Sequence, residues 1–509
     1  MVTDAQAQPP TPPQAQLKAG ALGTTGITFM VVAAAAPLTI MVGLAPLAIS
    51  IGGIGAPAGY LIAGGVLAIF AVGFMAMTRH TRGAGAFYSY ITLGLGRTLG
   101  AAAGLLAVFS YNTLQIGVYG LLGTQFAAAY HRFTGGSAPW WLFAGVGIVL
   151  VWALGRRGID VGAKVLGVLI VAETLILVLL VVAVLVQGGA GGLTAGTFTA
   201  DALSHPGMLA ILGFCFAAFM GFESTALYRS EARRPDRTIP RATYAAVAFL
   251  GLFYCLTGWA VVQAFGDGKV VAIAAADPPG LFFAAMDTYV GVWASDVMYV
   301  LVLTSVLAAQ LAFHNAINRY AFSLANDGLL PRALGRSHPR FLSPANAGAL
   351  QSGLAAVVVT AFAIAGADPY HQLVLLVNMP GAIGVLLLQM LTSAAVVAYF
   401  LRHRGVRGSG PAMVCAALAT VLLAGALWFI VKRLDLLTGA ATTTNASLAG
   451  LVPAVLLAGV SWALHLKKHR PDIHALIGGE DVRRAETTTR RKFVLEPEDP
   501  TAEAGAAPA

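Results

Sequence analysis

Charged residues are scarce in this chain. Asp, Glu, Lys and Arg together make up 10% of its 509 residues, whereas hydrophobic residues make up 58%. Soluble domains carry about a quarter charged residues, so most of this chain is not expected to face water. One membrane-crossing helix takes roughly 20 apolar residues. The composition therefore predicts a polytopic membrane protein with about twelve spans.

Cysteine and the common catalytic motifs are also missing or rare. The three cysteines each stand alone in an apolar stretch, without the paired spacing of a disulfide framework or a zinc site, and we expect them to pack in the core. No G-x-x-x-x-G-K-[ST] sequence occurs, so ATP hydrolysis by this chain is not expected to drive its function. No nucleophile–base pair or metal cluster is visible. We therefore expect neither an enzyme nor a cofactor, and no metal site.

The few basic residues alternate between the loops. One set of alternate loops carries eighteen Lys and Arg residues and the opposite set carries four. Basic loops stay in the cytoplasm, so the first set is expected there together with both termini. The net charge of +9 is thus explained by topology, and nucleic acid is not an expected partner. The expected partner is the lipid bilayer of the cell membrane.

Twelve apolar runs are expected to cross the membrane. They cover residues 27–49, 58–78, 96–129, 139–155, 162–187, 206–228, 242–265, 289–322, 344–366, 371–401, 411–431 and 446–466. The first run contains Pro37 and the sixth contains Gly213 and Gly221, and both residue types allow a membrane helix to break. Broken helices in corresponding halves are typical of inverted-repeat transporters. A generic bundle of kinked helices is the alternative on this spacing alone.

The segment GFESTALYRSEARRPDRTIPRA favours the transporter. It resembles a signature of the amino acid, polyamine and organocation permeases, in which the sixth helix runs into G-[FY]-[DE] and the following loop ends in a basic residue and I-P. The matching residues are Gly221, Phe222, Glu223, Glu231, Pro235, Arg237, Ile239, Pro240 and Arg241. Two further stretches resemble the family, around Tyr88 and Tyr90 and around Arg319, Asp327 and Pro331. The resemblance covers residues 20–470.

This resemblance implies an all-α polytopic fold. Twelve transmembrane helices are expected, with a leucine-transporter-like 5+5 inverted-repeat core, broken helices 1 and 6, and two peripheral helices. The expected segments are a disordered cytoplasmic N-terminal segment (1–20), the first five-helix repeat (21–190), the second five-helix repeat (191–405), peripheral helices 11 and 12 (406–466) and a cytoplasmic C-terminal tail (467–509).

Family members bind an amino acid or amine near the membrane midplane, between the two broken helices. The resemblance places the substrate-binding residues at Ala34, Ala35, Ala36, Pro37, Phe216, Ala217, Ala218, Phe219 and Gly221. The first helix departs from the family, because alanines replace its usual glycine-rich G-[ST]-G. Alanine is a good helix former, so the break is expected to depend on Pro37 and on tertiary contacts. Ala217 falls at the family's aromatic gate position and leaves more space unless Phe216 or Phe219 closes the site.

Two carboxyl groups are candidates for proton coupling or gating. Glu173 lies within the fifth apolar run, where a charge costs about 2.5 to 3.5 kcal/mol on insertion scales. Several family members have a lysine at this position, and it is thought to carry the coupled proton. The structural alternative for Glu173 is a neutral acid bonded to a neighbouring helix. Glu223 either caps amides freed by the helix break or acts as a gating carboxylate.

Other polar side chains within the spans are expected to make hydrogen bonds between helices rather than to bind substrate. They are Asn112, Gln115, Tyr119, Thr304, Ser305, Gln310 and Asn378. The hydroxyl groups of Thr304 and Ser305 could bind a sodium ion. Sodium is therefore an alternative to the proton as the coupling ion. The scarcity of buried acidic groups argues against a polycationic substrate.

Together these observations predict a secondary transporter in the cell membrane. It is expected to move amino acids or related small amines by alternating access, with proton coupling. The alternatives are an amino acid or amine exchanger without net ion coupling, and a transporter-like membrane sensor.

Overall fold

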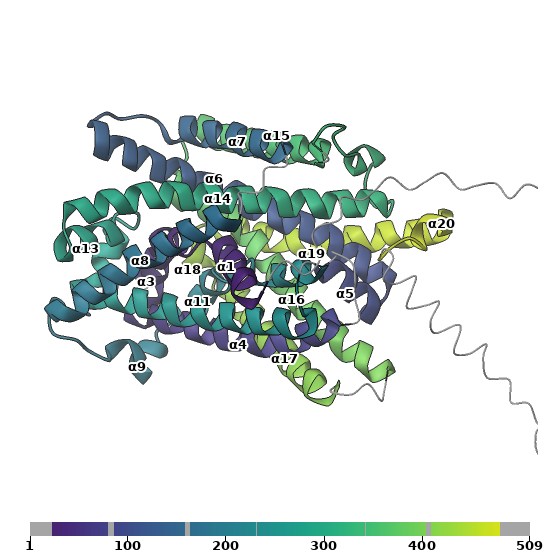
Figure 1. Cartoon of the computed structure of the whole chain (residues 1–509), viewed down its shortest axis with the longest axis horizontal. Coiled ribbons are helices and arrows are strands. Elements are labelled where there is room, and N and C mark those ends of the chain that lie inside the picture. The colour runs from purple at the N-terminus through teal and green to yellow at the C-terminus, as the bar shows by residue number, and fades with distance from the viewer. Residues whose placement is uncertain are drawn as a thin grey trace, which may run out of the picture.

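The computed structural model describes residues 23–79, 86–157, 163–230, 232–341, 343–403 and 409–478. Within these ranges the chain is helical and contains no β-strand element. Most of the long helices run along the longest axis of the molecule and form one bundle (Figure 1). The expected N-terminal segment 1–20, Glu231 of the signature and the end of the expected C-terminal tail lie outside the described residues.

The helices of the first half are α1 (Thr24–Ala35), α2 (Pro37–Gly43), α3 (Ala45–Gly52), η1 (Gly53–Gly55), α4 (Ala56–Thr78), α5 (Ala86–Leu95), α6 (Arg97–Thr134), α7 (Trp140–Arg156), α8 (Ala163–Gln187), η2 (Gly196–Phe198) and α9 (Ala200–Leu203). Those of the second half are α10 (Met208–Ala217), η3 (Phe222–Ser230), α11 (Pro235–Phe265), α12 (Val270–Ala276), α13 (Leu281–Tyr289), α14 (Val292–Asn326), η4 (Arg332–Gly335), α15 (Ala345–Ile364), η5 (Pro369–Val374), α16 (Leu375–Arg402), α17 (Ser409–Lys432), α18 (Leu434–Thr438), α19 (Thr442–His469) and α20 (Pro471–His474).

The lengths and hydropathy of these helices confirm a polytopic membrane protein. Among the described residues, 11 helical segments are long and apolar enough to cross a membrane. Each overlaps a predicted apolar run, and the second, Ala45–Thr78, covers the run 58–78 together with the end of the run 27–49. The fourth predicted run corresponds to α7, a shorter apolar helix of 17 residues. The count of twelve spans and the inverted repeat therefore stay predictions.

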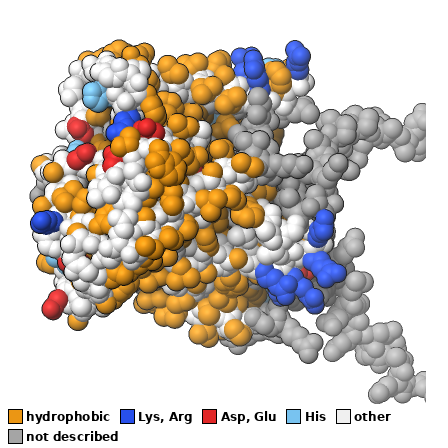
Figure 2. Space-filling model, turned by 60° about the vertical axis from the view of Figure 1, so that its left-hand side comes forward, with side chains coloured by type: hydrophobic (Ala, Val, Ile, Leu, Met, Phe, Trp, Pro, Cys, Tyr) orange, Lys and Arg blue, Asp and Glu red, His pale blue; other side chains and the backbone are white. Residues whose placement is uncertain are grey.

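The outer surface of the bundle is apolar over its middle. Large apolar side chains are exposed on several helices, including Val168 and Val186 on α8, Val357 on α15 and Val421 on α17. Figure 2 shows apolar side chains over the middle of the molecule, while Lys and Arg gather at its right-hand end in that view. An apolar band between polar ends matches the cross-section of a bilayer.

The first span is broken at Ala36. Helix α1 ends at Ala35, Ala36 adopts φ 45° and ψ 67°, and α2 begins at Pro37. Ala36 is the one described residue other than glycine that has a positive φ. The left-handed conformation costs an L-residue about 1–2 kcal/mol. Pro37 stabilises the restart of the helix, because proline favours the first helical position.

The sixth span is broken at Gly221. Helix α10 ends at Ala217, Gly221 has φ 106°, and the 3₁₀ helix η3 follows from Phe222. Gly213, which also allows a break, lies inside α10 without interrupting it. Both breaks expected in the predicted fold are therefore present.

The two breaks contact each other. A Cβ atom added to Gly221 would lie 3.2 Å from Ala34 Cβ and 3.5 Å from Ala35 N. The first of these distances is tighter than ordinary van der Waals contact, and the second is an ordinary contact. Because glycine has no Cβ, Gly221 can adopt a positive φ and also allows the backbone of the first span to approach closely.

Candidate functional site

A small cavity of about 70 Å³ lies beside the two breaks. Its walls come from the broken spans and from the long helices α6, α14 and α16. It is lined by Ala34, Ala35, Ala36, Thr39, Ile40, Leu44, Leu114, Val118, Phe214, Ala217, Met220, Ala309, Phe313, Val374, Asn378, Met379 and Ala382. The lining contains many alanines, and none of these side chains is charged.

The structure places four of the predicted binding residues at this cavity. Ala34, Ala35, Ala36 and Ala217 line it. The other five predicted residues are not part of the lining: Pro37, Phe216, Ala218, Phe219 and Gly221. Pro37 and Gly221 instead shape the two breaks.

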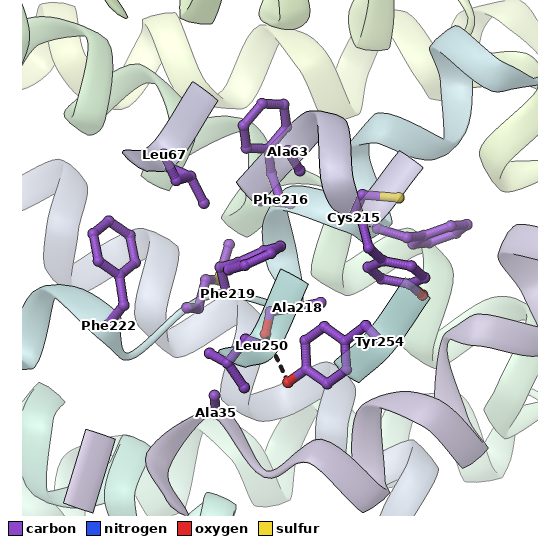
Figure 3. Packing of buried hydrophobic residues seen from close by; sticks show 14 of the residues in the cluster. Ala35, Ala63, Leu67, Cys215, Phe216, Ala218, Phe219, Phe222, Leu250 and Tyr254 are labelled. Carbon is purple, nitrogen blue, oxygen red and sulfur yellow. Dashed lines mark hydrogen bonds between the residues drawn. The ribbon is translucent and has the colours of Figure 1, made fainter. Parts of the chain in front are cut away.

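Helix geometry explains why Phe216 and Phe219 do not face the cavity. The residues of the sixth span that line it are Phe214, Ala217 and Met220, which are spaced three apart on one face. Phe219 is fully buried and packs edge-on against Tyr254 of α11, with ring centroids 5.9 Å apart (Figure 3). Phe214 and Phe313 therefore provide the aromatic rings of the cavity.

Tyr254 also holds the end of α10. Its hydroxyl donates a hydrogen bond to the carbonyl oxygen of Ala218 at 3.2 Å, drawn as the dashed line in Figure 3. Because a helix leaves its last carbonyls without intrahelical partners, this bond satisfies one acceptor at the break.

Glu173 connects three elements of the bundle. The carboxyl group belongs to α8 and is 4% exposed. It accepts a hydrogen bond from the Ser305 hydroxyl of α14 at 2.9 Å, and it lies close enough to the backbone amide of Leu38 in α2 to interact with it electrostatically. No cationic side chain among the described residues pairs with it.

A chain of hydroxyl groups links Glu173 to the cavity. Thr39, which lines the cavity, donates to Ser305 at 2.9 Å, and Ser305 donates to Glu173 at 2.9 Å. Three helices therefore contribute one continuous hydrogen-bonded path from the cavity wall to a buried carboxyl group.

Glu223 serves the other break. One carboxylate oxygen accepts a hydrogen bond from the Gly221 N–H at 3.0 Å, and the other accepts one from the Tyr111 hydroxyl of α6 at 2.5 Å. Glu223 is 4% exposed, and Tyr111 stacks on Tyr320 with centroids 5.7 Å apart. The carboxyl group thus caps an amide at the break, which is the structural role considered for it from the sequence.

The remaining polar side chains behave in different ways. Gln115 and Gln310 donate to each other's backbone carbonyls across α6 and α14, as expected for interhelical bonds. Asn112 and Thr304 instead donate to carbonyls of their own helices. Tyr119 and Asn378 each have a buried oxygen without a hydrogen-bond partner. Of these, only Asn378 lines the cavity.

The fold and the site define a class: a multi-pass membrane protein with a small buried cavity between two broken helices. The family model described as amino acid permease matches residues 26–475. The chain therefore belongs to the amino acid permease family, and the predicted resemblance is confirmed.

Curated relatives are transporters. An uncharacterized transporter of Mycobacterium tuberculosis is 29% identical over 203 residues, covering 40% of this chain and 45% of the relative. The low-affinity putrescine importer of Escherichia coli is 23% identical over 298 residues, covering 57% and 63%. The L-methionine/branched-chain amino acid exporter of Escherichia coli is 26% identical over 259 residues, covering 48% and 59%. The chain thus spans about half the length of the curated relatives that it matches.

Proposed function

We propose that this chain is a secondary transporter that moves amino acids or related small amines across the cell membrane by alternating access, coupled to protons through Glu173. The observation that carries the proposal is the hydrogen-bonded path from the cavity through Thr39 and Ser305 to Glu173. The family and the names of the relatives support the transport of amino acids or amines.

Substrate recognition would rely largely on backbone. The C-terminal ends of α1 and α10 meet at the cavity, and helix C-termini carry partial negative charge on their free carbonyl groups. An ammonium group is attracted to such carbonyls, and broken membrane helices in transporters are used in this way. The site therefore suits a substrate with an amino group.

Glu173 would carry the proton. A carboxylate buried without a counter-charge is costly, and binding a proton removes that charge. The same carboxyl group bonds Ser305 of α14 and interacts with the Leu38 backbone at the start of α2, so a change in its protonation would change the interactions that join the first span to α8 and α14. Proton binding would thereby alter how firmly the first span is held.

Orientation and segment division complete the proposal. The alternation of basic loops supports cytoplasmic termini, and the positions of the two breaks support an inverted repeat of segments 21–190 and 191–405. In this arrangement the two broken spans rock together against the surrounding helices.

The test is uptake by the purified full chain in liposomes with an imposed pH gradient, using a panel of radiolabelled amino acids and amines. We expect accumulation to follow the gradient in the wild type and to be abolished in Glu173→Gln, with counterflow retained. Thr174→Ala is the matched control, because the Thr174 hydroxyl bonds only the Ile170 carbonyl of its own helix.

Two outcomes would contradict the proposal. Gradient-driven accumulation that survives in Glu173→Gln would exclude Glu173 as the proton carrier. If the wild type showed counterflow but no accumulation in response to the pH gradient, the protein would be an exchanger instead.

A further inference from the structure

Two sequence motifs that the proposed site does not use meet at one end of the bundle. Tyr88 of α5 and Asp327, which follows α14, are 239 positions apart, yet the Tyr88 hydroxyl donates a hydrogen bond to the Asp327 carboxylate at 2.7 Å. The backbone N–H of Gly478 donates to the same hydroxyl oxygen at 2.6 Å. Gly478 ends the C-terminal segment 471–478, which contains α20 and lies at the same end of the bundle as α5 (Figure 1). The Tyr88 hydroxyl thus joins this segment to both motifs.

Packing also holds the C-terminal segment in place. Ile477 is fully buried in a small apolar cluster with residues of α5, α6, α14 and α19. The cluster consists of Tyr88, Ala101, Leu324, Leu329, Ala463, Leu466 and Ile477. A Cβ atom added to Gly328 would lie 2.6 Å from Ile473 Cγ2, so the glycine that follows Asp327 makes room for the segment. Apolar burial and two polar bonds together give the segment one defined position.

Tyr320 connects this cluster to the break of the sixth span. Its side chain, on α14, packs against the cluster and lies close enough to the Phe87 backbone of α5 to interact with it electrostatically. The same ring stacks on Tyr111, whose hydroxyl donates to Glu223. The C-terminal segment and Glu223 therefore lie at the two ends of one contiguous set of packed side chains. Such sets can carry energetic coupling between distant sites.

We propose that the C-terminal segment is an autoinhibitory latch, which holds α5 and the end of α14 together while it binds Tyr88 and Asp327 and thereby slows movement at the sixth-span break. The inference rests on the proposed transport and concerns its control. A contact that exists in only one conformation stabilises that conformation. The latch joins separate elements, so its contacts are lost when α5 moves relative to α14. Release of the latch therefore makes this movement easier and transport faster.

The test measures counterflow by the purified full chain in liposomes, with the best-transported member of the uptake panel. Tyr88→Phe removes the hydroxyl that Asp327 and Gly478 share, whereas Gly478→Pro removes the N–H and cannot adopt the φ of 93°. We expect each variant to raise the initial rate about two- to tenfold, the factor by which one hydrogen bond shifts an equilibrium. The double variant should be no faster than the faster single variant, because both release the same contact.

Asp472→Asn and Tyr119→Phe are the matched controls. Asp472 lies on the same segment but pairs with the neighbouring Arg470 at the surface. Tyr119 is a buried tyrosine of α6 whose hydroxyl bonds no described residue. Both substitutions should leave the rate unchanged. Ile477→Ala keeps the inference testable if a release variant does not fold, since it loosens the latch by removing apolar packing alone.

Hydrogen exchange gives a second readout that does not depend on transport. In the release variants, exchange should become faster in α5 and η3 and stay at the wild-type rate in α7. The inference is overturned if these variants transport at the wild-type rate or more slowly, or if exchange becomes faster in the C-terminal segment alone. Failure of the proposed function has a different signature. In that case the wild type transports no member of the panel, and exchange in α5 and η3 still decides whether the latch exists.

Discussion

Each of the two helix breaks is served by a buried carboxyl group, but the two groups reach their breaks in different ways. Glu223 lies two residues beyond Gly221 and accepts its N–H, so this cap belongs to the broken segment itself. Glu173 comes from α8, a separate helix, and reaches Leu38 just after the break at Ala36. The first arrangement is local and the second joins parts of the bundle.

This difference assigns the two carboxyl groups different tasks. A local cap keeps its geometry when the segment moves as a body, so Glu223 preserves the shape of the sixth span. A bond between separate helices must change when those helices shift, so under the proposed mechanism Glu173 would respond to movement of the first span. Tyr111 adds a cross-helix bond to Glu223, but the contact with Gly221 does not depend on it.

After Glu173→Gln itself, the largest expected effect comes from interrupting the path to Glu173 while leaving the carboxyl group in place. Ser305→Ala removes both the bond from Thr39 and the bond to Glu173. A hydrogen bond to a charged group contributes about 1.5–3 kcal/mol, so pH-driven accumulation in liposomes should fall about tenfold or more.

Thr304→Ala is the matched control for this variant. The neighbouring Thr304 hydroxyl bonds only the Leu301 carbonyl of its own helix, so its removal should leave accumulation near the wild-type level. Equal losses in the two variants would show that the hydroxyl path carries no coupling.

An intermediate effect is expected at the local cap. Glu223→Gln keeps the shape of the side chain but weakens its bonds to Gly221 and Tyr111, so we expect substrate affinity to be retained and exchange to slow. The free energy of unfolding should fall by about 1–3 kcal/mol, as for a damaged buried hydrogen-bond pair. Counterflow rates and denaturant unfolding measure the two effects.

Tyr111→Phe separates the cap from the cross-helix bond. It removes only the hydroxyl that donates to Glu223, so exchange should stay closer to the wild type than in Glu223→Gln. If exchange were slower in Tyr111→Phe than in Glu223→Gln, the important contact of Glu223 would be its bond to α6 rather than its bond to Gly221.

Much of the fold could be predicted from the sequence because membrane spans depend on long apolar runs. Most predicted runs coincide with the observed segments to within about seven residues, although the second segment, Ala45–Thr78, begins well before the predicted run 58–78, and both breaks lie in the predicted spans. The left-handed conformation of Ala36 could not be predicted, since the intrinsic preference of alanine is helical. The restart of the helix at Pro37 and the close packing of Ala34 and Ala35 against Gly221 accompany this departure from the helical conformation.

The cavity was only partly predictable. The resemblance placed the substrate-binding residues of the sixth span at consecutive positions. A helix, however, presents only every third or fourth residue to one side. Applying that spacing to Ala217 would have added Phe214 and Met220 in place of Phe216 and Phe219. Asn378 could not be told from other polar membrane residues, because its unpaired oxygen depends on packing against Gly117 of a distant segment.

The smallest expected effect concerns the backbone of the first break. Ala36→Gly relieves a left-handed conformation that costs about 1–2 kcal/mol, but glycine loses about 0.5–1 kcal/mol more conformational entropy on folding. The two terms nearly cancel, so the free energy of unfolding should change by less than about 1 kcal/mol and pH-driven uptake should persist. Denaturant unfolding measures the change in the free energy of unfolding, and liposome assays measure pH-driven uptake.

Gly221→Ala is the contrasting substitution at the second break. Here alanine would have to adopt φ 106° with its Cβ 3.2 Å from Ala34, so both conformation and contact oppose it. We expect a larger loss of stability than in Ala36→Gly, and slower transport. If Gly221→Ala were as well tolerated as Ala36→Gly, the close contact between the two breaks would not be needed. The broken spans would then move independently rather than as one unit.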